Sequence, residues 1–107
     1  MNALFICSRN QWRSPTAELV FRRYPNVQTR SAGTSPNARR TVSAADIAWA
    51  DKVFAMEQKH KNRLSAQFSR ALRHKEIIVL DIPDDYRYMD EDLIGILKES
   101  VEHYLPK

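Results

Sequence analysis

Short apolar runs alternate with longer segments of helical pattern along this chain, and that alternation constrains its fold more than any other feature. The predicted strands are residues 2–6, 27–31, 52–56 and 76–80, and the predicted helices are residues 15–23, 43–49, 58–68 and 91–104. Strands that alternate with helices form parallel sheets covered by helices on both faces. A chain of 107 residues can bury one such core. We therefore expect a single three-layer α/β/α domain over residues 1–107.

The connection between the first strand and the first helix has an unusual composition. It reads Cys7-Ser8-Arg9-Asn10-Gln11-Trp12-Arg13-Ser14 and is followed by Pro15. Ser14 is the expected N-cap, with Pro15 at the first helical position. A tight loop that leads into a helix N-terminus points backbone N–H groups at one spot, and the helix dipole adds partial positive charge there. We expect residues 8–14 to bind an anion such as inorganic phosphate or sulfate.

Cys7 and Arg13 are the residues of this loop that we expect to be catalytic. A thiolate attacks phosphorus, and loop dipoles together with a nearby guanidinium favour the thiolate over the thiol. Arg13 is preferred over Arg9, because six residues of loop bring the chain back around a phosphate and two do not. The Arg13 fork can hold two phosphate oxygens at once. No metal or organic cofactor is needed for this chemistry.

Charge and cysteine content limit the partners and the compartment. The net charge is +4, and the basic residues are dispersed along the chain, which disfavours nucleic acid as the partner. A single cysteine excludes an internal disulfide and a cysteine-rich metal site. No apolar run is long enough to cross a membrane, and no secretory signal is evident. We expect a cytoplasmic protein.

The Cys-x5-Arg-Ser pattern after the first strand resembles the low-molecular-weight protein tyrosine phosphatases. Asn10 and the tail Pro15-x-Ala17-Glu18 extend the match, and so does Ser31-Ala32-Gly33-Thr34 after the second strand. The resemblance implies a four-stranded parallel sheet of order 2-1-3-4. It also implies that Asn10, Ser14 and Ser31 support the loop, and that phosphotyrosine or a small aryl phosphate is hydrolysed through a phosphocysteine.

The same resemblance points to a general acid after the fourth strand. The family carries an Asp-Pro-Tyr sequence there, and Ile82-Pro83-Asp84-Asp85-Tyr86 aligns with it. We expect Asp84 to donate the proton, with Asp81 as the main alternative and Asp85 after it. Tyr86 would form an aromatic wall of the substrate pocket. Parallel strands end at one edge of the sheet, so Asp84 and Cys7 are expected to meet.

Two positions of the loop depart from the family pattern. Arg9 stands where the family usually has Gly, and Trp12 stands where a second Cys is common. We expect both at the rim of the pocket, where they leave the substrate open. A non-catalytic module that binds phosphate or phosphopeptides is therefore the main alternative, and an arsenate reductase that uses an external thiol is a weaker one. His60, His74 and His103 have no partner by spacing and are expected at the surface.

Overall fold

The computed structural model describes residues 1–107 and contains four strands, four α-helices and a short 3-10 helix. In chain order they are β1 (Asn2–Cys7), α1 (Arg13–Phe21), β2 (Gln28–Gly33), α2 (Ala44–Trp49), β3 (Lys52–Ala55), α3 (Gln58–Gln67), β4 (Ile77–Val79), α4 (Glu91–Val101) and η1 (Glu102–Tyr104).

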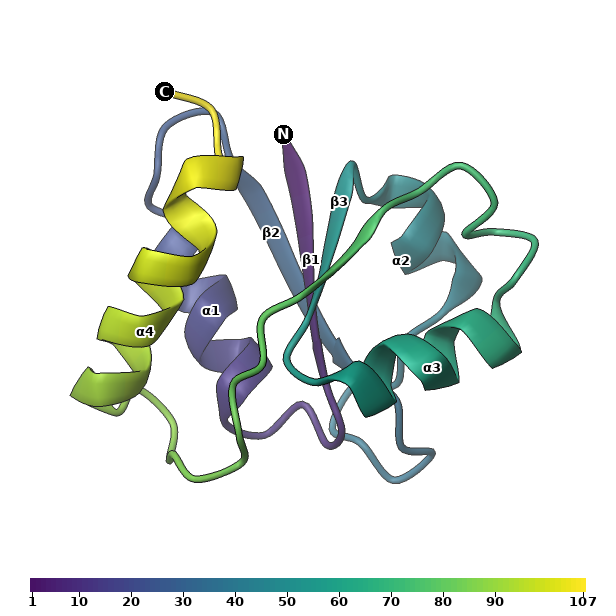
Figure 1. Ribbon diagram of the computed structural model, residues 1–107, viewed down its shortest axis with the longest axis horizontal. Coiled ribbons are helices and arrows are strands. Elements are labelled where there is room, and N and C mark those ends of the chain that lie inside the picture. The colour runs from purple at the N-terminus through teal and green to yellow at the C-terminus, as the bar shows by residue number, and fades with distance from the viewer.

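All strand pairs are parallel, and the sheet has the order β2-β1-β3-β4 (Figure 1). The expected order 2-1-3-4 is thereby confirmed. Helices α1 and α4 cover one face of the sheet, and α2 and α3 cover the other. All four strands run in one direction, so the loop after β1 and the loop after β4 lie at the same end of the molecule.

Alternate residues of β1 supply two separate cores. Ala3, Phe5 and Cys7 belong to the cluster under α1 and α4, and Phe5 stacks between the rings of Phe21 and Phe54. The side chains of Leu4 and Ile6 belong to the cluster under α2 and α3. A strand that is buried on both faces has a continuous apolar run, and this run predicts β1 from the sequence.

The first helix starts earlier than expected. It begins at Arg13, with Trp12 at the N-cap position and no side-chain capping bond, so the prediction of Ser14 as N-cap is wrong. The Ser14 hydroxyl contacts Cys7 instead. Pro15 still falls in the first turn, where an N–H group would have no partner in the helix.

The other boundaries differ by a few residues. Strand β2 continues to Gly33, β4 is limited to three residues, and α4 passes into the 3-10 helix after Val101. The capping box predicted at the start of α2 is confirmed: Ser43 Oγ accepts from Asp46 N at 3.3 Å, and Ser43 N donates to Asp46 Oδ2 at 3.0 Å.

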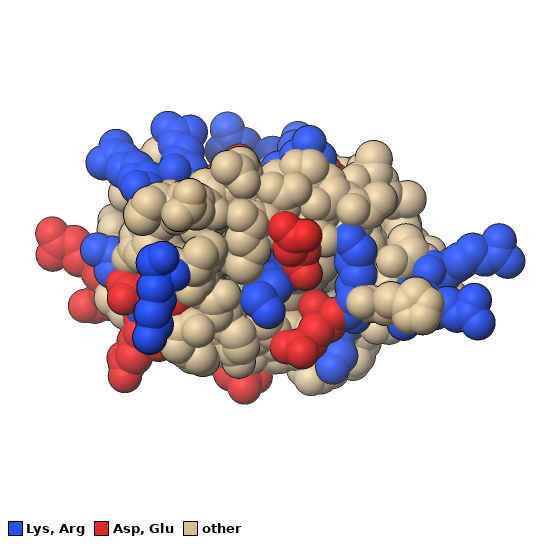
Figure 2. Space-filling model, turned by 90° about the horizontal axis from the view of Figure 1, so that it is seen from above, with Lys and Arg blue, Asp and Glu red and all other residues tan.

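The end of the molecule at which the strands begin carries both chain termini. Figure 2 looks onto that end, and acidic and basic side chains are interspersed there. None of the helices is long and apolar enough to cross a lipid bilayer.

Candidate active site

The loop from β1 to α1 turns its carbonyl groups outward. Three consecutive carbonyl oxygens accept hydrogen bonds of 2.9–3.0 Å from the segment after β2: Cys7 O from Thr34 N, Ser8 O from Ser35 N, and Arg9 O from Arg39 N. The N–H groups of residues 8–13 donate to no acceptor within the chain. Successive N–H groups left free in a loop at a helix N-terminus form a binding site for an anion.

Cys7 lies at the start of this loop with its side chain almost fully buried. Its Sγ is 2.9 Å from Ser14 Oγ. Asn10 Nδ2 donates to the same Ser14 oxygen at 3.0 Å, so that oxygen already accepts one hydrogen bond. The Ser14 hydrogen is therefore free to point at sulfur. A hydroxyl that donates to sulfur stabilises the thiolate.

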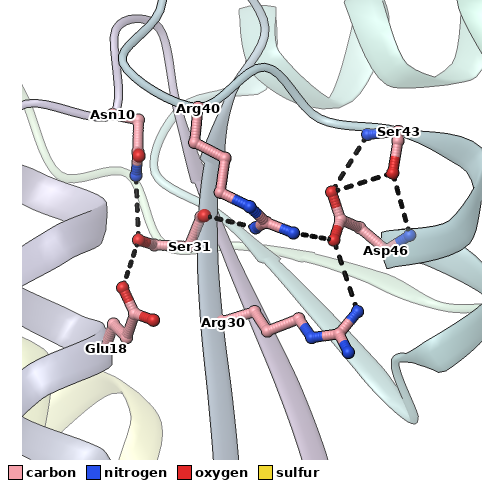
Figure 3. A network of polar contacts seen from close by, with 7 residues as sticks. All are labelled: Asn10, Glu18, Arg30, Ser31, Arg40, Ser43 and Asp46. Atoms are coloured by element: carbon pink, nitrogen blue, oxygen red, sulfur yellow. Dashed lines mark hydrogen bonds and ion pairs between the residues drawn. The ribbon is translucent and has the colours of Figure 1, made fainter.

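Asn10 holds the turn of the loop. Its φ of 53° lies in the left-handed region, which Asn adopts more readily than most residues. The second hydrogen of its side-chain amide goes to Ser31 Oγ at 2.8 Å, and Ser31 donates in turn to Glu18 Oε1 at 2.6 Å (Figure 3). Asn10, Ser14 and Ser31 thus form one chain of hydrogen bonds behind the loop.

The backbone carbonyl group of Ser31 contacts a second polar cluster. Arg40 donates to the carbonyl oxygen of Ser31 at 2.8 Å and pairs with the buried carboxylate of Asp46 (Figure 3). Burial raises the pKa of Asp46, but hydrogen bonds from the Ser43 backbone and from Arg40 outweigh burial and leave that pKa below its ordinary value. Asp46 is therefore charged, and it fixes the segment that supports the loop between β1 and α1.

Arg13 closes the loop, and its guanidinium group is buried. Nη1 donates to Glu57 Oε1 at 2.5 Å and to Ile82 O at 2.8 Å. Burial raises the pKa of Glu57, but the hydrogen bond and the charge of Arg13 outweigh it, so the pKa of Glu57 is lowered. A charged Glu57 at the end of β3 holds the fork in one orientation.

Asp84 lies at the same site from the loop after β4. Its Oδ1 is 3.6 Å from Arg13 Nε, and 58% of its side chain is exposed. A pocket of about 330 Å³ is lined by Cys7, Ser8, Arg9, Gln11, Trp12, Arg13, Lys59 and Asp84. Residues 77 positions apart thus face one cavity with a thiol, a guanidinium and a carboxylate. No group of three or more His, Cys, Asp or Glu side chains is placed to hold a metal ion.

We compared the sequence and the fold with those of known proteins. No family model matches the chain. A protein-arginine phosphatase of Bacillus subtilis (strain 168) is 32% identical over 97 residues, and the match covers 65% of that relative. The chain therefore spans just under two thirds of the relative's length.

Solved structures share the fold along nearly the whole chain. The YwlE arginine phosphatase with a phosphorylated active-site serine has a TM-score of 0.73 at 22% identity, covering 96% of this chain and 95% of that one. The tyrosine phosphatase Wzb from Escherichia coli K30, in complex with phosphate, has a TM-score of 0.75 at 22% identity, covering 96% and 94%. The chain therefore has the fold of these phosphatases.

The residues predicted for the rim of the pocket divide into two groups. Arg9 and Trp12 line the pocket, and so does Gln11. Tyr86 is not among the lining residues, because it is half-buried against the core cluster under α1 and α4. Of the other candidate acids, Asp81 is exposed in a left-handed turn with φ of 55°, and neither Asp81 nor Asp85 lines the pocket.

Three contributors from the end of β3 and the start of α3 were missed by sequence reasoning. They are Glu57, which orients Arg13, Lys59, which lines the pocket, and His60. The expectation that His60 is a surface residue is wrong, since it is 1% exposed and its Nε2 lies 2.9 Å from Ser8 Oγ. The signal was a capping pair, with Glu57 as N-cap and His60 three residues on, directly after a strand whose end faces Cys7.

Proposed function

We propose that the protein is a cysteine-dependent phosphatase that hydrolyses phosphotyrosine or small aryl phosphate monoesters through a phosphocysteine. The observation that carries this proposal is the meeting of Cys7, Arg13 and Asp84 around one pocket whose wall is a loop of free N–H groups. Nucleophile, charge stabiliser and proton donor are the three functions that the reaction requires.

In the first step, the Cys7 thiolate attacks phosphorus in line with the leaving oxygen. The S–P bond forms as the P–O bond breaks, and the carboxyl group of Asp84 gives its proton to the departing oxygen. Charge on the transferring oxygens is met by the N–H groups of residues 8–13 and by the Arg13 fork. These donors are already held in place by the contacts behind the loop, so little reorganisation is needed.

In the second step, water attacks the phosphocysteine. The carboxylate of Asp84 takes a proton from that water, the S–P bond breaks, and Cys7 leaves as a thiolate stabilised by the Ser14 hydroxyl. Inorganic phosphate is released and the enzyme returns to its starting state. A fold neighbour with a phosphorylated active-site serine supports a covalent phosphoenzyme. Neighbours in complex with phosphate and sulphate support anion binding in the loop.

Phosphoarginine is the second candidate substrate. The 32%-identical relative is a protein-arginine phosphatase. Tyr86 does not line the pocket, which leaves Trp12 as its aromatic side chain, and the exposed carboxylate of Asp84 can pair with a substrate guanidinium. Steady-state hydrolysis of free phosphotyrosine and free phosphoarginine, compared as kcat/KM, decides between the two substrates.

The mechanism predicts separate effects for the nucleophile and the acid. We expect Cys7→Ser to abolish hydrolysis of an aryl phosphate, and Asp84→Asn to lower kcat about 10²- to 10⁴-fold. The loss in Asp84→Asn should be larger for phenyl phosphate than for nitrophenyl phosphate, because the poorer leaving group depends more on the proton. Asp85→Asn is the matched control and should retain activity.

Two outcomes would change the assignment. If Asp81→Asn removes the leaving-group-dependent activity and Asp84→Asn does not, the acid is Asp81. If the wild type binds phosphate but turns over none of the substrates, the protein is a phosphate-binding module rather than an enzyme.

A lone reactive thiol with no second cysteine nearby is readily oxidised, so we also propose that the protein works in the reducing cytoplasm.

A further inference from the structure

A second pocket of about 460 Å³ lies beside the catalytic one. The two pockets share Ser8 and Lys59 in their walls. We propose that this second pocket binds a carboxylate side chain next to the phosphorylated residue of a protein substrate. The proposal rests on the phosphatase function and names the class of substrate that the same site prefers.

The lining of the second pocket is basic. It contains Lys59 and Arg63, and no Asp or Glu is part of it. The Lys59 side chain is 64% exposed and has a loose contact of 3.9 Å with Glu57. Arg63 has a single long hydrogen bond, 3.5 Å from Nη2 to Thr34 O. Neither cation is fully paired within the chain, so both can bind an incoming anion.

The wall that the two pockets share contains a neutral hydrogen-bond donor, the Ser8 hydroxyl. Glu57 N donates to His60 Nδ1 at 3.0 Å, so the proton of the neutral ring is on Nε2. Nε2 then donates to Ser8 Oγ at 2.9 Å, which uses the serine oxygen as an acceptor. The Ser8 hydrogen is left to point away from His60, toward an anion at the junction of the two pockets.

The shape favours a carboxylate at the end of a short aliphatic stem. Besides its two cations, the pocket is bordered by Thr34, Asn62 and Ala66, which are small or uncharged. Methylene groups of a Glu side chain can pack against such a wall while the carboxylate reaches the guanidinium of Arg63, and the Arg fork matches a carboxylate in two-point geometry.

The test uses two phosphotyrosine peptides as competitive inhibitors of aryl phosphate hydrolysis. One carries Glu on both sides of the phosphotyrosine, and the other carries Gln at the same positions. We expect the Glu peptide to inhibit the wild type about three- to tenfold more tightly. Arg63→Gln should bring that ratio close to one, whereas Arg70→Gln, an exposed arginine outside this pocket, should keep it.

Each variant's ratio is measured against its own turnover of the aryl phosphate, so a general loss of activity cancels. Equal inhibition by the two peptides in the wild type, failure of both peptides to compete, or an unchanged ratio in Arg63→Gln would overturn the proposal. Absence of aryl phosphate turnover in the wild type would instead refute the phosphatase function, and direct binding of the two peptides would then test the pocket by itself.

Discussion

At the scale of a single residue, His60 is buried and makes two hydrogen bonds, one with the backbone of Glu57 and one with Ser8. Burial is the main cause that lowers its pKa from 6.5 to about 4, and the charge of Arg13 acts in the same direction. The ring is therefore neutral at neutral pH, and its Nε2–H orients the Ser8 hydroxyl. A charged ring would put a second N–H against the backbone N–H of Glu57.

This lowered pKa predicts a pH dependence of stability. Between pH 6.5 and about 4 the unfolded chain binds a proton that the native protein does not, so the free energy of unfolding falls as pH is lowered through that window. The full effect is roughly 3 kcal/mol, since each pKa unit corresponds to about 1.36 kcal/mol. Urea unfolding at pH 7.5, 6, 5 and 4 measures it.

The variant His60→Gln should be less stable than the wild type at pH 7.5 and should lose most of the slope between pH 6.5 and 4. His74 is exposed and provides the matched control, since His74→Gln should leave the slope unchanged. An undiminished slope in His60→Gln would show that other groups cause the pH dependence.

At the scale of elements, the conformation of the loop between β1 and α1 depends on how closely the end of β2 approaches it. A Cβ on Gly33 would lie 2.5 Å from the carbonyl oxygen of Ser8 and 2.6 Å from the Cβ of Ala38. Glycine at this position lets the segment after β2 come near enough for its N–H groups to hold the carbonyls of the loop.

The two glycines of the chain therefore predict opposite effects. Gly33→Ala should lower the free energy of unfolding by roughly 1–3 kcal/mol, because backbone must shift to relieve the clash, and should weaken phosphate binding. Gly95 lies within α4 with nothing within 4 Å of its added Cβ, so Gly95→Ala should stabilise by about 0.5–1 kcal/mol and leave phosphate affinity unchanged. Chemical denaturation and phosphate titration measure both. Full stability and affinity in Gly33→Ala would contradict the role of this close approach.

At the scale of the whole molecule, the anion site is formed by segments that follow all four strands of the sheet. Its donors and their supports come from the loop after β1, the segment after β2, the start of α3 and the loop after β4. Such a site exists only in the folded protein, so an anion that binds it stabilises the native state by mass action.

Phosphate should therefore raise the melting temperature. At about 100 times its Kd, a ligand adds about 2.7 kcal/mol, which for a domain of this size corresponds to a rise of roughly 10 °C. Calorimetry in phosphate and in chloride at equal ionic strength measures the rise. Arg13→Gln, scanned against its own melting temperature in chloride, should lose most of it. A full rise in Arg13→Gln would show that phosphate acts elsewhere on the protein.

The sheet followed from the sequence because the apolar runs of β1, β3 and β4 alternate with helical patterns, whereas the strand order followed from the family resemblance. The loop motif indicated the position of the site. Contacts between distant segments could not be predicted in the same way. Lys59 and His60 lie on a polar helix whose capping pair, Glu57 and His60, does not indicate a pocket, and their roles appear only when the start of α3 is brought against Ser8. The N-cap of α1 was predicted at the wrong residue because the Ser14 hydroxyl contacts Cys7 instead of capping the helix. Helix-capping preferences take no account of such a contact with another part of the chain.

The contacts of Arg13 with Glu57 and with the carbonyl of Ile82 also determine when during synthesis the site can form. Cys7 is translated well before Ile82, and the fork that faces it is fixed only after residue 82 has been translated and β4 has joined the sheet. Until then Cys7 is an ordinary thiol on an incomplete fold. A growing chain that ends before residue 82 is thus expected to lack the fixed orientation of Arg13 on which the proposed hydrolysis depends.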